Sequence, residues 1–137
     1  MSTYPEDLYA AAKAVLPNAY ARYSHFPVAA SIRTKSGQIY AGVNVENASF
    51  SLTCCAEQNA VSTMIAQGNN SITQTLILTQ GPLLCPPCGA CRQVLNEFAS
   101  PDCEVHLCTL TGDHKQFYFT ELLPATFGSD HLKTDGA

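Results

Sequence analysis

Two short stretches of the sequence combine cysteine and glutamate at spacings that could build a zinc site with a catalytic acid. Cys88 and Cys91 form a Pro-Cys-x-x-Cys arrangement, and Cys55 and Glu57 form a Cys-x-Glu arrangement earlier in the chain. Three thiolates that leave one corner of a tetrahedron open are typical of a catalytic zinc. We therefore expect Cys55, Cys88 and Cys91 to hold one Zn²⁺, with Glu57 beside it as the general acid–base group.

Two other cysteines have spacings that compete with this choice. Cys85-x-x-Cys88 repeats the same interval, but Cys85 precedes two prolines and so lies before the expected helix start. Cys54 neighbours Cys55, but on a helix it would point about 100° away. Glu57 also has a simpler interpretation, as a first-turn acid that favours the helix dipole. The odd total of seven cysteines argues against a disulfide framework.

Each cysteine cluster lies where the pattern predicts the start of a helix. Apolar residues recur at helical spacing after Cys91, as far as Phe98, and after Cys55, as far as Gly68. Unpaired N–H groups and the positive end of the dipole favour thiolates at such positions. The site therefore requires a fold that brings two helix starts together.

The remaining pattern predicts an α/β fold: a three-layer α/β/α arrangement with a five-stranded mixed sheet. Strands joined through helices imply partly parallel pairing, and ligands in such folds sit near helix starts. We expect a single zinc-dependent domain over residues 1–128 and a loosely ordered tail over residues 129–137. The other expected elements are a helix over residues 6–15, strands over 28–34, 39–46, within 71–80, over 104–109 and 116–120, and a helical turn over 121–123.

Composition excludes several classes of function. Charged residues make up 13% of the 137, well below the roughly 25% of an average globular chain, which favours a covered surface and hence an oligomer. The net charge is −4 and only seven Lys and Arg are present, so no basic stripe exists to bind a polynucleotide. No apolar run approaches the roughly 20 residues needed to span a membrane. With no signal-peptide pattern, the expected location is cytoplasmic.

Over nearly its whole length the sequence resembles the cytidine deaminases, and most closely their short, three-cysteine, homotetrameric zinc class. The resemblance implies hydrolytic deamination of cytidine and deoxycytidine to uridine and deoxyuridine in pyrimidine salvage, by a zinc-activated water with Glu57 as proton shuttle. It is carried by Phe26-Pro27-Val28, by the run from Gly42 to Ala48, by Cys55-Ala56-Glu57, by the run from Pro87 to Gln93, and by Leu122-Leu123-Pro124 with Phe127.

The same resemblance implies roles for further residues. Phe26 would stack near the pyrimidine ring, Asn44 and Glu46 would bind the ribose hydroxyls, and Ala56 would meet the base with Glu57. Ala48, Phe50 and Phe127 would reach the site of a neighbouring subunit of a homotetramer. Gln58 and Arg92 would lie behind the thiolates. Without the resemblance, Asn44 and Glu46 would be interpreted as solvent-facing residues at the end of a strand. Phe26 and Phe127 would be interpreted as core residues.

Three positions depart from the family pattern. Gln58 stands where members of this class usually carry Arg, Ala29 replaces the usual Gly, and Phe50 replaces the usual Tyr. Two of these, Gln58 and Phe50, keep a second hypothesis open: a deaminase of the same fold that acts on a modified aminopyrimidine nucleoside or a nucleoside antibiotic. A third hypothesis is a non-catalytic zinc-binding protein, against which Glu57 and the open fourth position argue.

Overall fold

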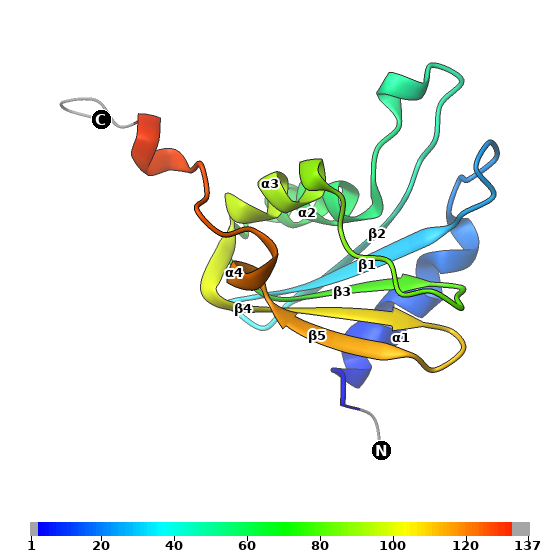
Figure 1. The fold of residues 1–137 in the computed structure, drawn as a ribbon, viewed down its shortest axis with the longest axis horizontal. Helices are drawn as coiled ribbons and strands as arrows, with labels where there is room; N and C mark the ends of the chain where they lie inside the picture. The colour runs from blue at the N-terminus through cyan, green and yellow to red at the C-terminus, as the bar shows by residue number, and fades with distance from the viewer. Residues whose placement is uncertain (1–2, 133–137) are drawn as a thin grey trace.

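The computed structural model describes residues 3–132 and has the expected three layers (Figure 1). Five strands form one mixed sheet in the order β2-β1-β3-β4-β5. One helix, α1, covers one face of the sheet, and α2 and α3 lie on the other. The elements are α1 Glu6–Val15, β1 Val28–Thr34, β2 Ile39–Val43, α2 Ala56–Ala66, β3 Ile72–Thr79, α3 Gly89–Asn96, β4 Ala99–Thr109, β5 His114–Tyr118 and α4 Phe119–Leu122, with 3₁₀ turns Leu16–Asn18, Phe50–Leu52 and Ser129–Leu132.

Among the five named strands, only β3 and β4 pair in parallel, and α3 is the helix that connects them. The other three pairings, β1 with β2, β1 with β3 and β4 with β5, are antiparallel. The α/β class and the five-stranded mixed sheet are thus confirmed. Some boundaries differ from expectation: β2 ends at Val43 instead of residue 46, and β5 begins at His114 instead of residue 116.

The core has two parts, one on each face of the sheet. On the first face, Leu8 and Ala12 of α1 pack with buried residues of β1 and β3. On the second, α2 and α3 pack against the sheet through Met64 and Leu95, together with Ile77 and Val105 of the central strands. Burying each of the larger of these side chains, those of leucine, isoleucine, valine and methionine, contributes about 1.5–3 kcal/mol. This packing fixes the positions at which α2 and α3 begin.

A close approach between β2 and α2 depends on Gly42. A Cβ atom at this position would lie 2.5 Å from the backbone nitrogen of Ala60 and 2.7 Å from the carbonyl oxygen of Ala56. Backbone atoms cannot give way to a side chain at that distance, so a residue with a side chain would push the helix off the sheet. Gly42 therefore determines how closely the first turn of α2, which carries Glu57, approaches β2.

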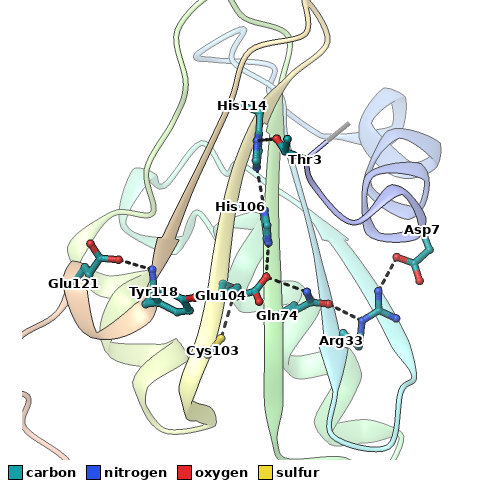
Figure 2. A network of polar contacts seen from close by, with 10 residues as sticks. All are labelled: Thr3, Asp7, Arg33, Gln74, Cys103, Glu104, His106, His114, Tyr118 and Glu121. Carbon is teal, nitrogen blue, oxygen red and sulfur yellow. Dashed lines mark hydrogen bonds and ion pairs between the residues drawn. The ribbon is translucent and has the colours of Figure 1, made fainter. Parts of the chain in front are cut away.

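The β4–β5 end of the sheet carries a chain of polar contacts that ties down the N-terminal segment (Figure 2). His106 is 2% exposed, and its Nε2 lies 2.8 Å from the Glu104 carboxylate. Its Nδ1 lies 3.0 Å from His114 Nε2, and His114 Nδ1 lies 2.7 Å from the Thr3 hydroxyl. Gln74 donates to the same carboxylate at 3.1 Å. These contacts join β3, β4 and β5 to the start of the chain.

Two segments extend beyond the sheet. One is the connection from β2 to α2, and the other is the chain after α4, which leads away from the sheet (Figure 1). Of the tail expected over residues 129–137, Ser129–Leu132 form a 3₁₀ turn, and residues 133–137 lie outside the described part. No helix within residues 3–132 is both long enough and apolar enough to cross a bilayer.

Candidate active site

Three cysteine sulfurs converge where α2 and α3 begin. Cys55 is the N-cap residue of α2, Cys88 is the N-cap of α3, and Cys91 lies in the first turn of α3. The Sγ atoms of Cys55 and Cys88 are 4.0 Å apart, and all three sulfurs lie within 4.8 Å of one another. A tetrahedral zinc with Zn–S bonds of about 2.3 Å places its sulfurs about 3.8 Å apart. The donor set is therefore positioned to bind a metal of this kind.

The ionisation of these thiols depends strongly on a nearby cation. Burial raises the pKa of Cys91, and the negative charge of Glu57 raises it further. Burial likewise raises the pKa of Cys55. The pKa of Cys88 is lowered, because hydrogen bonds from Cys91 and Cys55 outweigh the effect of its burial. All three can be thiolates together only when a metal ion compensates their charge.

The two competing cysteines do not join this group. Within residues 3–132, Cys55, Cys88 and Cys91 are the one set of at least three such donors close enough to share a metal. Cys54 is exposed, and its backbone pairs with Val45. Cys85 lines the cavity beside the sulfurs, and its own sulfur lies 3.6 Å from the carbonyl oxygen of Pro86.

Glu57 lies in the first turn of α2 with its side chain almost fully enclosed. The residue is 5% exposed and lines the same cavity as Cys55 and Cys88. Burial raises the pKa of its carboxyl group, although its own backbone N–H opposes this shift. A carboxyl group whose pKa moves toward neutrality can both accept and donate a proton, which is what a shuttle requires.

Gln58 and Arg92 both support the metal ligands, but in different ways. Gln58 Nε2 donates a hydrogen bond to Cys91 Sγ at 3.8 Å. Arg92 donates from Nε to the carbonyl oxygen of Pro87 and from Nη1 to that of Leu122, both at 2.8 Å. Among the described contacts, the guanidinium reaches carbonyl oxygens and not a sulfur. Arg92 therefore holds the turn before Cys88 in place.

Two adjoining cavities lead away from the sulfurs. The inner cavity has a volume of about 160 Å³, and the outer one has a volume of about 380 Å³. Thr53 lines both, so they meet at that residue. The inner cavity is lined by Val28, Asn44, Thr53, Cys55, Ala56, Glu57, Cys85, Pro86 and Cys88, and the outer by Tyr23, Ser24, Glu46, Phe50 and Thr53.

Some of the expected substrate-binding residues line the two cavities, and others do not. Asn44 and Ala56 line the inner cavity, and Glu46 and Phe50 line the outer one. In contrast, Phe26, Ala48 and Phe127 line neither of these two cavities and are exposed. Phe127 is 55% exposed and stacks on His131, with ring centroids 5.3 Å apart.

Asn44 and Glu46 also hold the loop that precedes β1. The Asn44 amide accepts from the Val28 N–H at 3.0 Å and donates to the Phe26 carbonyl oxygen at 2.9 Å. The Glu46 carboxylate accepts from the Tyr23 N–H at 2.8 Å and from the Ser24 N–H at 3.0 Å. Hydrogen bonds from the Ser24 side chain and backbone lower the pKa of Glu46, so the group stays ionised.

Comparison with known proteins agrees with this geometry. Residues 2–107 match the family described as the cytidine and deoxycytidylate deaminase zinc-binding region. The chain belongs to the cytidine and deoxycytidylate deaminases. The match spans both cysteine clusters and Glu57.

Individual relatives extend the match over most of the chain. Cytidine deaminase of Sporosarcina psychrophila is 39% identical over 129 residues, 93% of each protein. A solved structure of cytidine deaminase from Burkholderia pseudomallei is 38% identical, with a TM-score of 0.84 over 93% of this chain and 100% of that one. Blasticidin-S deaminase of Bacillus cereus is 30% identical over 109 residues, 73% of this chain and 76% of that protein.

Some residues of this deaminase site were not found from the sequence. Thr53 joins the two cavities, and Ser24 contacts Glu46 from a loop without periodic structure. The sequence indicates Cys85 only as a rival ligand, yet this residue lines the inner cavity. A local pattern marks elements and metal ligands, but it does not show which loop residues face a cavity. The one available signal for Ser24 was its position two residues before Phe26.

Proposed function

We propose that the chain catalyses the hydrolytic deamination of cytidine and deoxycytidine, releasing ammonia and forming uridine and deoxyuridine. The observation that carries the proposal is the enclosed Glu57 carboxyl group in the cavity that Cys55 and Cys88 also line. The relatives named cytidine deaminase support the choice of substrate. The buried acid also argues against a purely structural metal site, which would have no use for it.

The chemistry assigned to the protein's own groups is proton transfer and orientation. A zinc ion bound by the three thiolates lowers the pKa of water and so makes hydroxide available near neutral pH. Glu57 accepts the proton of the attacking water and gives it to the ring nitrogen beside the reacting carbon. The oxygen adds to that carbon to give a tetrahedral intermediate. Glu57 then takes the proton of the new hydroxyl group on that carbon and passes it to the amino group. The C–N bond breaks as the C=O bond of uridine forms, and ammonia leaves.

Binding of the sugar is assigned to Asn44 and Glu46. A carboxylate accepts hydrogen bonds from sugar hydroxyls and repels a phosphate, so a nucleoside is favoured over a nucleotide. Binding at the sugar, remote from the reacting carbon, is a source of energy for orienting the base. Glu46 lines the outer cavity and Asn44 the inner one, which fits a ligand that extends across both.

We further propose a homotetramer in which neighbouring subunits complete each site through Ala48, Phe50 and Phe127. Phe50 is 75% exposed, and both extended segments carry large apolar side chains that a partner would cover. The test is sedimentation at assay concentration with activity measured on the same sample. A fully active monomer would refute the shared sites. Phe127→Ala should weaken substrate binding without loss of zinc.

The function is tested by the fall in ultraviolet absorbance when cytidine is added to zinc-loaded protein. Conversion of cytidine and deoxycytidine supports the proposal. Blasticidin S should be assayed beside them, because the relative from Bacillus cereus carries that name and Gln58 and Phe50 depart from the family pattern. Turnover of the antibiotic alone would favour this second candidate. Bound zinc with no deamination of any nucleoside would refute both.

A further inference from the structure

Ser24 links two residues that the proposed function places at the substrate. Its hydroxyl donates to Glu46 Oε2 and accepts a hydrogen bond from the Phe26 N–H at 3.0 Å. Its backbone N–H also donates to Glu46 Oε1, at 3.0 Å. One serine thus contacts the carboxylate expected at the sugar and the backbone of the aromatic residue expected at the base.

The Glu46 carboxylate already accepts several hydrogen bonds, and these limit the direction in which it can accept another from a ligand. An ionised carboxylate has about four lone-pair sites. Two on Oε1 accept from the N–H groups of Tyr23 and Ser24, and one on Oε2 accepts from the Ser24 hydroxyl. The remaining site lies on Oε2, the oxygen that the Ser24 hydroxyl contacts. The serine hydroxyl therefore sets the direction in which Glu46 can accept a further hydrogen bond.

The backbone next to Ser24 has an unusual conformation that hydrogen bonds must stabilise. His25 has a φ angle of 56°, in the left-handed region that residues with a side chain rarely adopt. Two hydrogen bonds hold this conformation: the His25 N–H donates to the Ala21 carbonyl oxygen at 2.9 Å, and the Phe26 N–H donates across His25 to Ser24 Oγ. The Asn44 side-chain amide also donates a hydrogen bond to the Phe26 carbonyl oxygen, at 2.9 Å.

We infer that Ser24 is a positioning residue for the sugar of the substrate. It orients the free lone pair of Glu46 toward a sugar hydroxyl and at the same time fixes the turn that presents Phe26. Both Ser24 and Glu46 line the outer cavity of about 380 Å³, which adjoins the cavity of the sulfurs at Thr53. The inference rests on the proposed function, because it takes Glu46 as a sugar-binding residue.

The experiment compares Ser24→Ala with wild type on two substrates, cytidine and dideoxycytidine, which lacks both ring hydroxyls of the sugar. For cytidine, KM should rise about five- to ten-fold, while kcat should stay within about two-fold of the wild-type value. This KM increase is somewhat smaller than that expected when a direct hydrogen bond to a charged group is lost. For dideoxycytidine, KM should change by less than about two-fold. Ser24→Ala added to Glu46→Gln should have a similarly small effect, because the two residues act as one unit.

Two control variants distinguish loss of the Ser24 hydroxyl from a general structural effect of the substitution. Ser24→Thr keeps the hydroxyl and should restore most of the wild-type KM for cytidine. Ser62→Ala alters an exposed serine of α2 and should match wild type throughout. Zinc content and Tm are measured for every variant, so that a folding defect is recognised.

The outcomes separate the inference from the proposed function. An equal KM increase on both substrates, or no increase on either, would overturn the role of Ser24 while leaving deamination intact. A wild-type protein that deaminates neither substrate would overturn the proposed function and this inference with it. If Ser24→Ala fails to fold, Ser24→Cys replaces it, and the same selective effect on the sugar-bearing substrate is expected.

Discussion

The side-chain amide of Gln58 donates a hydrogen bond to the sulfur of Cys91, at 3.8 Å. Cys91 is the most deeply buried of the three converging cysteines, and burial raises its pKa. Gln58 therefore stabilises the thiolate through a dipole, whereas the Arg that the family resemblance leads us to expect at this position would supply a full charge. A cation at this position should make the thiolates easier to form.

Gln58→Arg should consequently retain zinc at lower pH than wild type. Metal binding requires the thiols to lose their protons, so a lower thiol pKa shifts the pH of half-release downward. The measurement is zinc remaining after dialysis against a weak chelator over a pH series. The pH limiting activity on the acidic side should move in the same direction. Gln58→Leu, which removes the donor, should shift half-release upward. An unchanged release curve in both variants would contradict this account of Gln58.

Cys88→Ser and Cys91→Ser should each lose the metal. The matched controls are Cys85→Ser and Cys54→Ser, which alter the two rival cysteines and should keep about one zinc per chain. Atomic absorption on purified protein gives the stoichiometry directly. Cys88 belongs to both possible Cys-x-x-Cys pairs, so zinc retained in Cys91→Ser but lost in Cys85→Ser would show that the wrong pair was assigned.

Glu57→Gln should keep zinc and fold but lose turnover. The amide matches the carboxyl group in size, so the cavity is preserved, but it cannot carry the proton. A fall in kcat of at least about 10²–10⁴-fold is expected for loss of a general acid–base group. Glu97→Gln, at the exposed glutamate that is the C-cap of α3, serves as the control and should be fully active. Near-normal kcat in Glu57→Gln would refute the proton shuttle.

His114 should make the stability of the protein fall in mild acid. Burial lowers its pKa below the ordinary value of 6.5, and the neighbouring His106 lowers it further. Below pH 6.5 the unfolded chain therefore binds more protons than the folded one, so stability decreases as the pH falls toward the folded-state pKa. His114→Gln should flatten the dependence of Tm on pH in this window. The difference should not exceed about 2–4 °C, because the ring is partly exposed and solvent screens it.

The control for this prediction is His131→Gln, which alters a histidine of the C-terminal 3₁₀ turn outside the network of Figure 2. It should leave the wild-type dependence of Tm on pH unchanged. The interpretation would be wrong if His114→Gln showed the same acid slope as wild type.

Elements with strong local signals could be predicted from the sequence. The helix over residues 6–15 and the strand over 28–34 have the expected bounds, because alanines and Pro17 define the first and the turn after residue 34 ends the second. The start of β4 was missed, since Pro101 and Asp102 are poor strand residues and only pairing with β3 extends the strand back to Ala99. Phe119 begins α4 instead of lying inside the strand expected over 116–120, because burial of its ring in the core outweighs the local alternation. The helical turn expected over 121–123 therefore starts earlier and spans Phe119–Leu122.

The site shows the same division. The cysteine cluster was predictable, because metal ligands follow short fixed spacings at helix starts. The two cavities and the bonds from Glu46 to residues 23 and 24 were not, because they depend on how a loop 22 to 23 positions away folds back. The roles assigned to Phe26, Ala48 and Phe127 remain predictions that require the bound nucleoside and the neighbouring subunits.

Cys55 and Cys88 are 33 positions apart, and the chain between them contains α2 and the whole of β3. β3 is the middle strand of the five and pairs with both β1 and β4. A cation bridging these cysteines acts as a reversible cross-link that closes a chain loop around the centre of the sheet. By analogy with a disulfide, such a closure removes about 3–5 kcal/mol of conformational freedom from the unfolded chain. Chelation should therefore loosen the centre of the molecule together with its catalytic pocket.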